Sequence, residues 1–151
     1  MQYEIKVGEK VKREINRGRQ VFSTNWIKKI DAEPGSLAKL TYNNKFLAWG
    51  VINPKDEYHY IRILSYNEDL DINKEIEEKI KNAKKYREEI INYKDHYRLI
   101  YSESDFLSGL IIDKYNDIFV IQNVNPFFDK NMNIIVEALT KIFGNNITIY
   151  E

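Results

Sequence analysis

The segment of residues 97–115, YRLIYSESDFLSGLIIDKY, constrains the fold of this chain more than any other. An apolar stretch with one arginine leads into the polar cluster Ser102-Glu103-Ser104-Asp105. Gly109 and a second apolar run follow. Serine and acidic side chains accept hydrogen bonds from backbone N–H groups at bends, and glycine takes positive φ without steric cost. The segment therefore predicts a strand, a tight turn and a second strand.

The first 66 residues have the pattern of a small β-barrel, with several short strands between turn signals. A helix is expected over residues 9–17, because Val11 and Ile15 are four apart among charged residues and Gly18 follows. Asn43 and Asn44 are expected to form a hairpin turn. The expected strands are residues 3–7, 21–23, 26–27, 37–42, 46–52 and 58–64.

The pattern changes after residue 66, where apolar residues recur at helical spacing up to about residue 92. A strand over 118–124, a helix over 129–143 capped by Asp129, and a strand over 147–150 follow the hairpin. The fold class is therefore α+β. We predict a barrel over residues 1–68, a linker helix over 69–93 and a small α+β domain over 94–151.

Several kinds of chemistry find no support in the residues. The chain has no cysteine, and none of its six glycines forms the G-x-G of a Rossmann nucleotide loop. His59 and His96 lack metal-ligand partners at helical spacing, so we interpret both as structural. No catalytic residue, metal site or cofactor site is predicted in this chain. Without a long apolar run or a signal peptide, we expect a cytoplasmic protein with no membrane contact.

Charge is divided unevenly along the chain. Residues 1–66 hold 12 Lys/Arg against 7 Asp/Glu, and residues 67–151 hold 11 against 16. The segment of residues 10–19 is the most basic part, and arginine can bind phosphate oxygens bidentately. Two interpretations remain open for this segment: a phosphate-binding surface, or a solvated helix face.

Three further charged residues have alternative interpretations. Glu103 and Asp105 could act as paired carboxylates in acid–base chemistry, but we favour turn capping because no nucleophile or base accompanies them. Arg62 alternates with apolar Ile61 and Ile63. It either pairs with a carboxylate inside the fold or reaches RNA, and we favour internal pairing.

Residues 97–115 resemble a hairpin in ribosomal RNA cytosine-5 methyltransferases that carry an N-terminal PUA domain, a small RNA-binding barrel. The pattern of that family is close to Y-R-L-x-x-x-E-S-D-G-L-P-G-L-I-x-D-x-Y. This chain departs from it at Phe106 and Ser108, where the family usually has glycine and proline.

Two more motifs carry the resemblance. Residues 17–23, RGRQVFS, resemble the family's Arg-Gly-His-Pro loop and its Val-Phe-Ser strand, with Arg19 and Gln20 in place of His and Pro. Residues 50–55 and 61–65 are similar to two segments of the family's barrel, G-x-x-N-P-x-S and I-x-V-R-I-L-S.

The resemblance implies a PUA-like barrel, a linker helix and a central α+β domain that packs on a C-terminal Rossmann-like methyltransferase domain. That domain, its S-adenosylmethionine site and its catalytic cysteine are absent from this chain. The residues implied in RNA binding are Arg13, Arg17, Arg19, Gln20, Lys55 and Arg62. The residues implied in domain docking are Glu103, Asp105, Gly109 and Asp113.

The resulting hypothesis is that the chain is the RNA-recognition and domain-docking portion of an S-adenosylmethionine-dependent enzyme that forms 5-methylcytosine in 23S ribosomal RNA. Its partners would be ribosomal RNA and the missing methyltransferase domain, and a homodimer is left open. The alternatives are a stand-alone RNA-binding or interaction module without catalysis, and a scaffold whose acidic second half is an interaction surface.

Overall fold

The computed structural model describes residues 2–151, which form two compact units. The first unit comprises the residues up to Leu70 together with Asn125–Lys130. The second comprises Asp71–Val124 and Asn131–Glu151. Both units combine helices with a β-sheet, so the predicted α+β class is confirmed.

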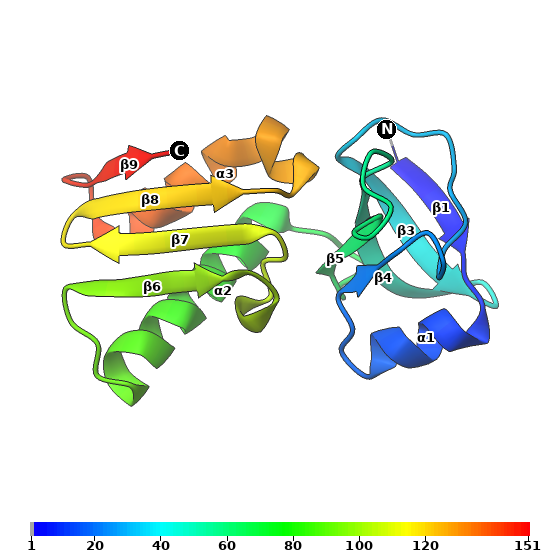
Figure 1. Ribbon diagram of the computed structural model, residues 1–151. Coiled ribbons are helices and arrows are strands. Elements are labelled where there is room, and N and C mark those ends of the chain that lie inside the picture. The colour runs from blue at the N-terminus through cyan, green and yellow to red at the C-terminus, as the bar shows by residue number, and fades with distance from the viewer. Residues whose placement is uncertain (1) are drawn as a thin grey trace. The chain divides into compact units, whose positions relative to one another are not determined.

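The first unit is built on a five-stranded sheet in the order β1-β3-β4-β5-β2 (Figure 1). β1 pairs in parallel with β3, and the other neighbours are antiparallel. Its elements are β1 (Gln2–Lys6), α1 (Glu9–Asn16), β2 (Val21–Phe22), β3 (Ser36–Tyr42), β4 (Lys45–Ile52) and β5 (Ile61–Ser65).

Local sequence explains most of these elements. Asn43 and Asn44 have φ values of 49° and 61°, the left-handed pair that a two-residue hairpin between β3 and β4 requires. Val11 and Ile15 bury the apolar face of α1 against the sheet, and Gly18 leaves the helix with a φ of 93°. The core of this unit gathers apolar side chains from α1 and all five strands, such as Ile5, Phe22, Leu40, Ile52 and Ile61.

Two predicted strand segments are loops. Residues 26–27 form a turn, because the N–H groups of Trp26 and Ile27 donate to the carbonyl of Ser23. β5 begins at residue 61 rather than 58, because the side chain of Asp56 accepts the N–H groups of Tyr58 and His59 and turns them away from the sheet.

The second unit is a four-stranded sheet in the order β6-β7-β8-β9, with helices on one face (Figure 1). β6, β7 and β8 are antiparallel, and β9 is parallel to β8. Its elements are α2 (Ile72–Lys85), the π-helical turn η1 (Tyr86–Ile90), β6 (His96–Tyr101), the 3₁₀ turn η2 (Ser102–Asp105), β7 (Leu110–Tyr115), β8 (Ile118–Asn123), α3 (Pro126–Phe143) and β9 (Thr148–Tyr150).

Helix α2 falls in the second unit, which begins at Asp71. Asp71 caps it by accepting the N–H of Lys74 at 3.3 Å. Ile76, Ile80 and Ala83 form its buried face.

Two predictions for this part of the chain are wrong in detail. The connection between β6 and β7 is not a tight turn, because η2 and residues 106–109 lie between the strands. The third helix begins at Pro126, before Asp129: Asn125 caps its first turn by accepting the N–H of Phe127 at 3.0 Å. Asn131, with a φ of −132°, interrupts this helix where the two units divide it.

Gly35 is a position where only glycine fits. Its φ is 87°, and a Cβ there would lie 2.7 Å from the carbonyl oxygen of Pro126. Gly35→Ala should therefore destabilise the first unit by about 2–4 kcal/mol. Gly18→Ala is the matched control, since φ is 93° but no atom lies within 4 Å, and should cost about 1 kcal/mol.

Urea unfolding followed by tryptophan fluorescence measures this difference, because Trp26 and Trp49 both lie in the first unit. Equal losses for the two variants would show that the approach to Pro126 is not a tight contact.

Candidate nucleic-acid interface

Exposed basic side chains gather at both ends of α1. Arg13 and Arg17 have side chains that are 57% and 68% exposed near its C-terminal end. Their ion pairs are long and solvated: Arg13 lies 3.7 Å from Glu9, and Arg17 lies 3.5 Å from Glu14. Such pairs contribute little to stability, so both guanidinium groups can exchange these partners for phosphate oxygens at small cost.

Arg19 is held more firmly than the other two arginines. Its guanidinium lies over the ring of Trp26 at 4.4 Å and over Phe22 at 5.4 Å. Its Nε donates to the carbonyl of Val21 at 3.0 Å, and Nη1 lies 3.6 Å from Glu14. This stacking fixes the loop after α1, which brings Arg17 and Arg19 together around Glu14.

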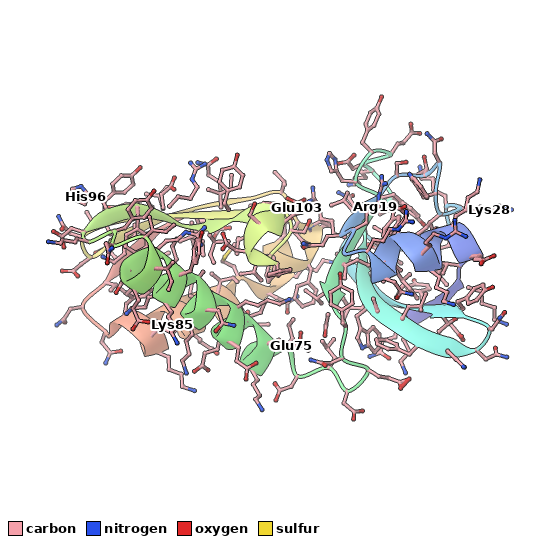
Figure 2. The ribbon with its side chains drawn as sticks, turned by 90° about the horizontal axis from the view of Figure 1, so that it is seen from below. Arg19, Lys28, Glu75, Lys85, His96 and Glu103 are labelled. Atoms are coloured by element: carbon pink, nitrogen blue, oxygen red, sulfur yellow. The ribbon has the colours of Figure 1, made fainter. Side chains whose placement is uncertain are left out.

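A basic hollow of about 450 Å³ lies at the other end of α1. Lys6, Lys28 and Lys29 line it together with Gly8 and Trp26. Figure 2 shows Arg19 and Lys28 at opposite ends of α1. The sequence-based prediction missed these lysines, because they come from two separated segments and carry no motif.

Two other predicted RNA-binding residues, Gln20 and Lys55, lie in loops of the first unit. Lys55 is exposed in the loop between β4 and β5, which is tied to the segment after β2 by the bond from Thr24 N–H to Glu57 O at 2.9 Å. Gln20 lies beside Arg19, and its carbonyl accepts the N–H of Ile63 at 2.8 Å. Roles for Lys55 and Gln20 in RNA binding stay predictions.

Arg62 is buried in the first unit. It lies in β5, in register with Val21 and Val51, and is only 4% exposed. This burial agrees with the favoured interpretation that Arg62 lies inside the fold, and its role in RNA binding stays a prediction.

Tyr58 is the most exposed large apolar side chain of the described residues, at 81%. Asp56 fixes its loop by accepting two backbone N–H groups and by contacting Nδ1 of His59 at 3.0 Å. Burial acts to raise the pKa of Asp56, but these hydrogen bonds and the His59 side chain outweigh it and lower that pKa. The carboxylate therefore remains charged and keeps the loop in shape.

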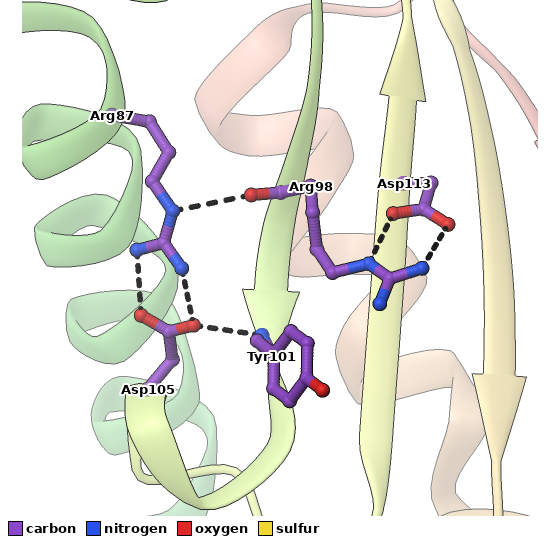
Figure 3. Close-up of polar contacts among 5 residues, drawn as sticks. All are labelled: Arg87, Arg98, Tyr101, Asp105 and Asp113. Carbon is purple, nitrogen blue, oxygen red and sulfur yellow. Dashed lines mark hydrogen bonds and ion pairs between the residues drawn. The ribbon is translucent and has the colours of Figure 1, made fainter. Parts of the chain in front are cut away.

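The hairpin of the second unit is held by a bidentate ion pair (Figure 3). Arg87 donates from Nη1 and Nη2 to the two carboxylate oxygens of Asp105, each at 2.7 Å, and from Nε to the carbonyl of Arg98. Asp105 also accepts the N–H of Tyr101 at 2.7 Å. One interaction thus joins η1, β6 and η2, and it uses Asp105 as a structural carboxylate.

The other predicted docking residues also have partners within the hairpin. Glu103 accepts the hydroxyl of Ser108 at 3.0 Å. Gly109 has a φ of 85°, and its N–H donates to Oγ of Ser102 at 2.8 Å. With Asp105, these bonds agree with the favoured turn-capping interpretation rather than with acid–base chemistry.

Asp113 lies on the sheet face opposite α2 and α3, where Arg98 donates to it at 2.8 and 3.2 Å (Figure 3). Aromatic and aliphatic side chains surround this pair. The register aligns Arg98, Asp113, Val120 and Tyr150 in one row across the four strands. The open sheet face consists of the exposed residues Arg98, Tyr101, Tyr115, Ile118 and Tyr150.

A second interaction joins η1, the turn at the end of α2, to β6. The Tyr97 hydroxyl donates to Glu88 at 2.5 Å, and Lys84 contacts the other carboxylate oxygen at 3.1 Å. Burial and the Glu88 carboxylate raise the pKa of Tyr97. Burial alone would raise the pKa of Glu88, but these two partners lower it.

Within residues 2–151, no helix is long and apolar enough to cross a membrane. The same residues contain no group of three or more His, Cys, Asp or Glu side chains arranged to hold a metal ion.

Residues 5–66 match a protein family described as PUA-like domain. This match confirms the predicted PUA-like character of that part of the chain, which carries the basic surface around α1.

Curated relatives are named as methyltransferases of large-subunit ribosomal RNA. The ribosomal RNA large subunit methyltransferase I of Vibrio parahaemolyticus is 33% identical over 131 residues, which cover 83% of this chain and 32% of the relative. A protein of Methanocaldococcus jannaschii, assigned provisionally by its name to the same activity, is 46% identical over 96 residues, or 63% of this chain and 23% of the relative. The chain therefore spans about a quarter to a third of these relatives.

A solved structure shows the same fold. A protein of Streptococcus mutans, named provisionally as an S-adenosylmethionine-dependent methyltransferase, superposes with a TM-score of 0.81 at 19% identity. The match covers 93% of this chain and 38% of that protein. At this identity the likeness establishes the fold alone.

Removing one partner of the Arg87–Asp105 pair should lower the free energy of unfolding of the second unit. The two side chains are 12% and 8% exposed, so Asp105→Ala leaves a buried guanidinium without its counter-ion. We expect a loss of about 3–5 kcal/mol, measured by urea unfolding with far-UV circular dichroism. Lys81→Ala, which removes an exposed partner of Glu77, should leave the midpoint almost unchanged. An Asp105→Ala midpoint like that of the wild type would contradict a structural role for the pair.

Proposed function

We propose that this chain is the RNA-recognition and domain-docking portion of an S-adenosylmethionine-dependent methyltransferase that acts on large-subunit ribosomal RNA. The observation that carries the proposal is the basic surface around α1 in the PUA-like domain. This α1 surface consists of Arg13, Arg17 and Arg19 at the C-terminal end of α1 and of Lys6, Lys28 and Lys29 at its other end, and Arg19 stacks on Trp26.

The α1 surface has the chemistry that phosphate binding requires. Neutralising phosphates with Lys and Arg releases condensed counterions, which supplies most of the sequence-independent affinity for RNA. The solvated pairs of Arg13 and Arg17 are easily exchanged, whereas Arg19 positions the loop through Trp26. Lys55 and Gln20 extend the proposed contact on the loops that follow β4 and α1.

The second unit would serve as the docking element. Its open sheet face presents three tyrosines and one isoleucine around the Arg98–Asp113 pair, a composition typical of protein interfaces. Glu103, Asp105 and Gly109 would act by shaping the hairpin at the end of that sheet, since their own polar groups are used within it. In this proposal residues 1–68 bind RNA and residues 94–151 dock the methyltransferase domain.

S-adenosylmethionine does not fit the residues of this chain. Rossmann-like domains hold such ligands at a glycine-rich loop between a strand and a helix. The loop from β1 to α1 contains the single glycine Gly8, and the loop from β8 to α3 contains none. The cofactor and the chemistry are therefore assigned to the part of the parent protein outside this chain.

We propose cytosine as the base that the parent enzyme methylates. The three motifs that resemble cytosine-5 methyltransferases favour 5-methylcytosine in 23S ribosomal RNA as the product. The alternative is a stand-alone RNA-binding module, favoured if the chain binds RNA without affecting any methylation.

Substituting Arg13 and Arg17 by glutamine should weaken RNA binding and flatten its dependence on salt. Each lost phosphate contact lowers the slope of log K against log salt by about 0.7–0.9. Fluorescence anisotropy with a labelled ribosomal RNA hairpin across a salt series measures both quantities. Lys81→Gln, an exposed lysine on the second unit, is the matched control and should change neither. An unchanged slope for Arg13→Gln/Arg17→Gln would remove the α1 surface from the interface.

Deleting the gene should abolish one 5-methylcytosine in large-subunit ribosomal RNA. Bisulfite sequencing of that RNA from the deletion strain and from the same strain with the gene restored detects the change. A methylation pattern identical in both strains would exclude the methyltransferase proposal, and RNA binding alone would then be the function.

A further inference from the structure

Phe106 is held in a backbone conformation that disfavours its side chain. Its φ and ψ are 62° and 26°, in the left-handed region that bulky residues rarely adopt. Every other non-glycine residue with positive φ in residues 2–151 is Asn or Ser, whose short polar side chains are better suited to bends. Core packing does not explain the choice, because Phe106 is 59% exposed.

Phe106 lines a pocket of about 430 Å³ between α2 and η2. Tyr86, which is 50% exposed, lines the same pocket. Two exposed aromatic residues thus line one hollow of the second unit. Strained residues that packing does not require are concentrated at ligand-binding sites.

The rim of the pocket carries polar groups suited to the edge of a base. Lys79, Asn82 and Ser104 line it with the two aromatic rings, and together they offer both donors and acceptors. Lys79, Asn82 and Tyr86 follow one another at helical spacing, so α2 and the η1 turn that continues it present them on one face. Burial lowers the pKa of Lys79, an effect that Glu75 partly offsets.

A bidentate ion pair joins two further residues of the pocket. Arg87 and Asp105 also line it, and their bidentate bonds at 2.7 Å hold η1 against η2. The N–H of Phe106 donates to the carbonyl of Glu103, and the N–H of Leu107 donates to that of Ser102. These bonds fix the backbone around Phe106 and keep its ring at the pocket.

We propose that this pocket binds one unpaired base of the RNA, which stacks on Tyr86 and Phe106. Single-stranded bases are recognised by stacking on aromatic rings and by hydrogen bonds to their edges. The inference rests on the proposed RNA-binding function and extends it to the second unit. The α1 surface would contact phosphates, and this pocket would take a base.

The test separates base binding from phosphate binding. The probe is a fluorescein-labelled RNA hairpin with an unpaired loop, compared with the same hairpin whose loop is abasic. Wild-type chain should bind the abasic hairpin about tenfold more weakly, the worth of one base–aromatic stack. Tyr86→Ala/Phe106→Ala should bind both hairpins with the weaker affinity. Tyr93→Ala, an exposed tyrosine that does not line the pocket, should behave as wild type.

Phe106→Gly distinguishes a binding role from a structural one. Glycine adopts positive φ freely, so this variant should unfold at a higher urea concentration than wild type while binding the intact hairpin more weakly. A lower unfolding midpoint would show that the ring serves folding, and would overturn the proposal.

The outcomes distinguish the two proposals. The base pocket would be rejected if the wild type bound the intact and the abasic hairpin with equal affinity. It would also be rejected if Tyr86→Ala/Phe106→Ala bound the intact hairpin as tightly as the wild type. Either result would leave the proposal for the α1 surface unaffected. Absence of any binding at low salt would reject RNA recognition and the pocket with it. Equal competition by free adenosine monophosphate would assign the pocket to a mononucleotide instead of RNA.

Discussion

The architecture of the second unit depends on the bidentate pair between Arg87 and Asp105. Arg87 stands just after α2, where the helix widens into a π turn, and Asp105 ends the 3₁₀ turn after β6. Because both side chains are nearly buried, each charge needs the other. The planar guanidinium matches both carboxylate oxygens at once, so the pair fixes orientation as well as distance.

The first unit uses its charges in the opposite way. Arg13 and Arg17 have long, solvated pairs on the surface of α1, and most of the core of that unit is apolar. Arg19 is intermediate, because its charge is partly exposed while its planar face rests on Trp26. The solvated arginines of α1 are thus available to a ligand, whereas the Arg87–Asp105 pair is committed to the fold.

Local sequence predicted those features that depend on neighbouring residues. The Asn43-Asn44 turn and helix α1 follow directly from φ preferences and apolar spacing. The sequence could not show that Asp56 would remove Tyr58 from β5, since that depends on side-chain bonds within the loop. Two interpretations of Arg62 stayed open for a related reason: alternation in a strand does not reveal whether its second face is covered.

The candidate sites were harder to predict than the fold. Lys6 and Lys28 line one hollow although they come from β1 and from the loop after β2, and Tyr86 and Phe106 line one pocket although they are 20 positions apart in the sequence. Only Phe106 left a local signal, as a departure from glycine in the motif of the resembling family.

The bidentate pair between Arg87 and Asp105 also explains how the strain at Phe106 persists. A left-handed phenylalanine costs about 1–2 kcal/mol, and an isolated turn would relax it by rotating the backbone. Here the adjacent Asp105 is bound by Arg87 and by the N–H of Tyr101, while the N–H groups of Phe106 and Leu107 are bound within η2. Relaxing one residue would break several of these bonds, each worth about 1 kcal/mol or more. The Arg87–Asp105 pair therefore stabilises the second unit and also keeps the exposed Phe106 in the left-handed backbone conformation.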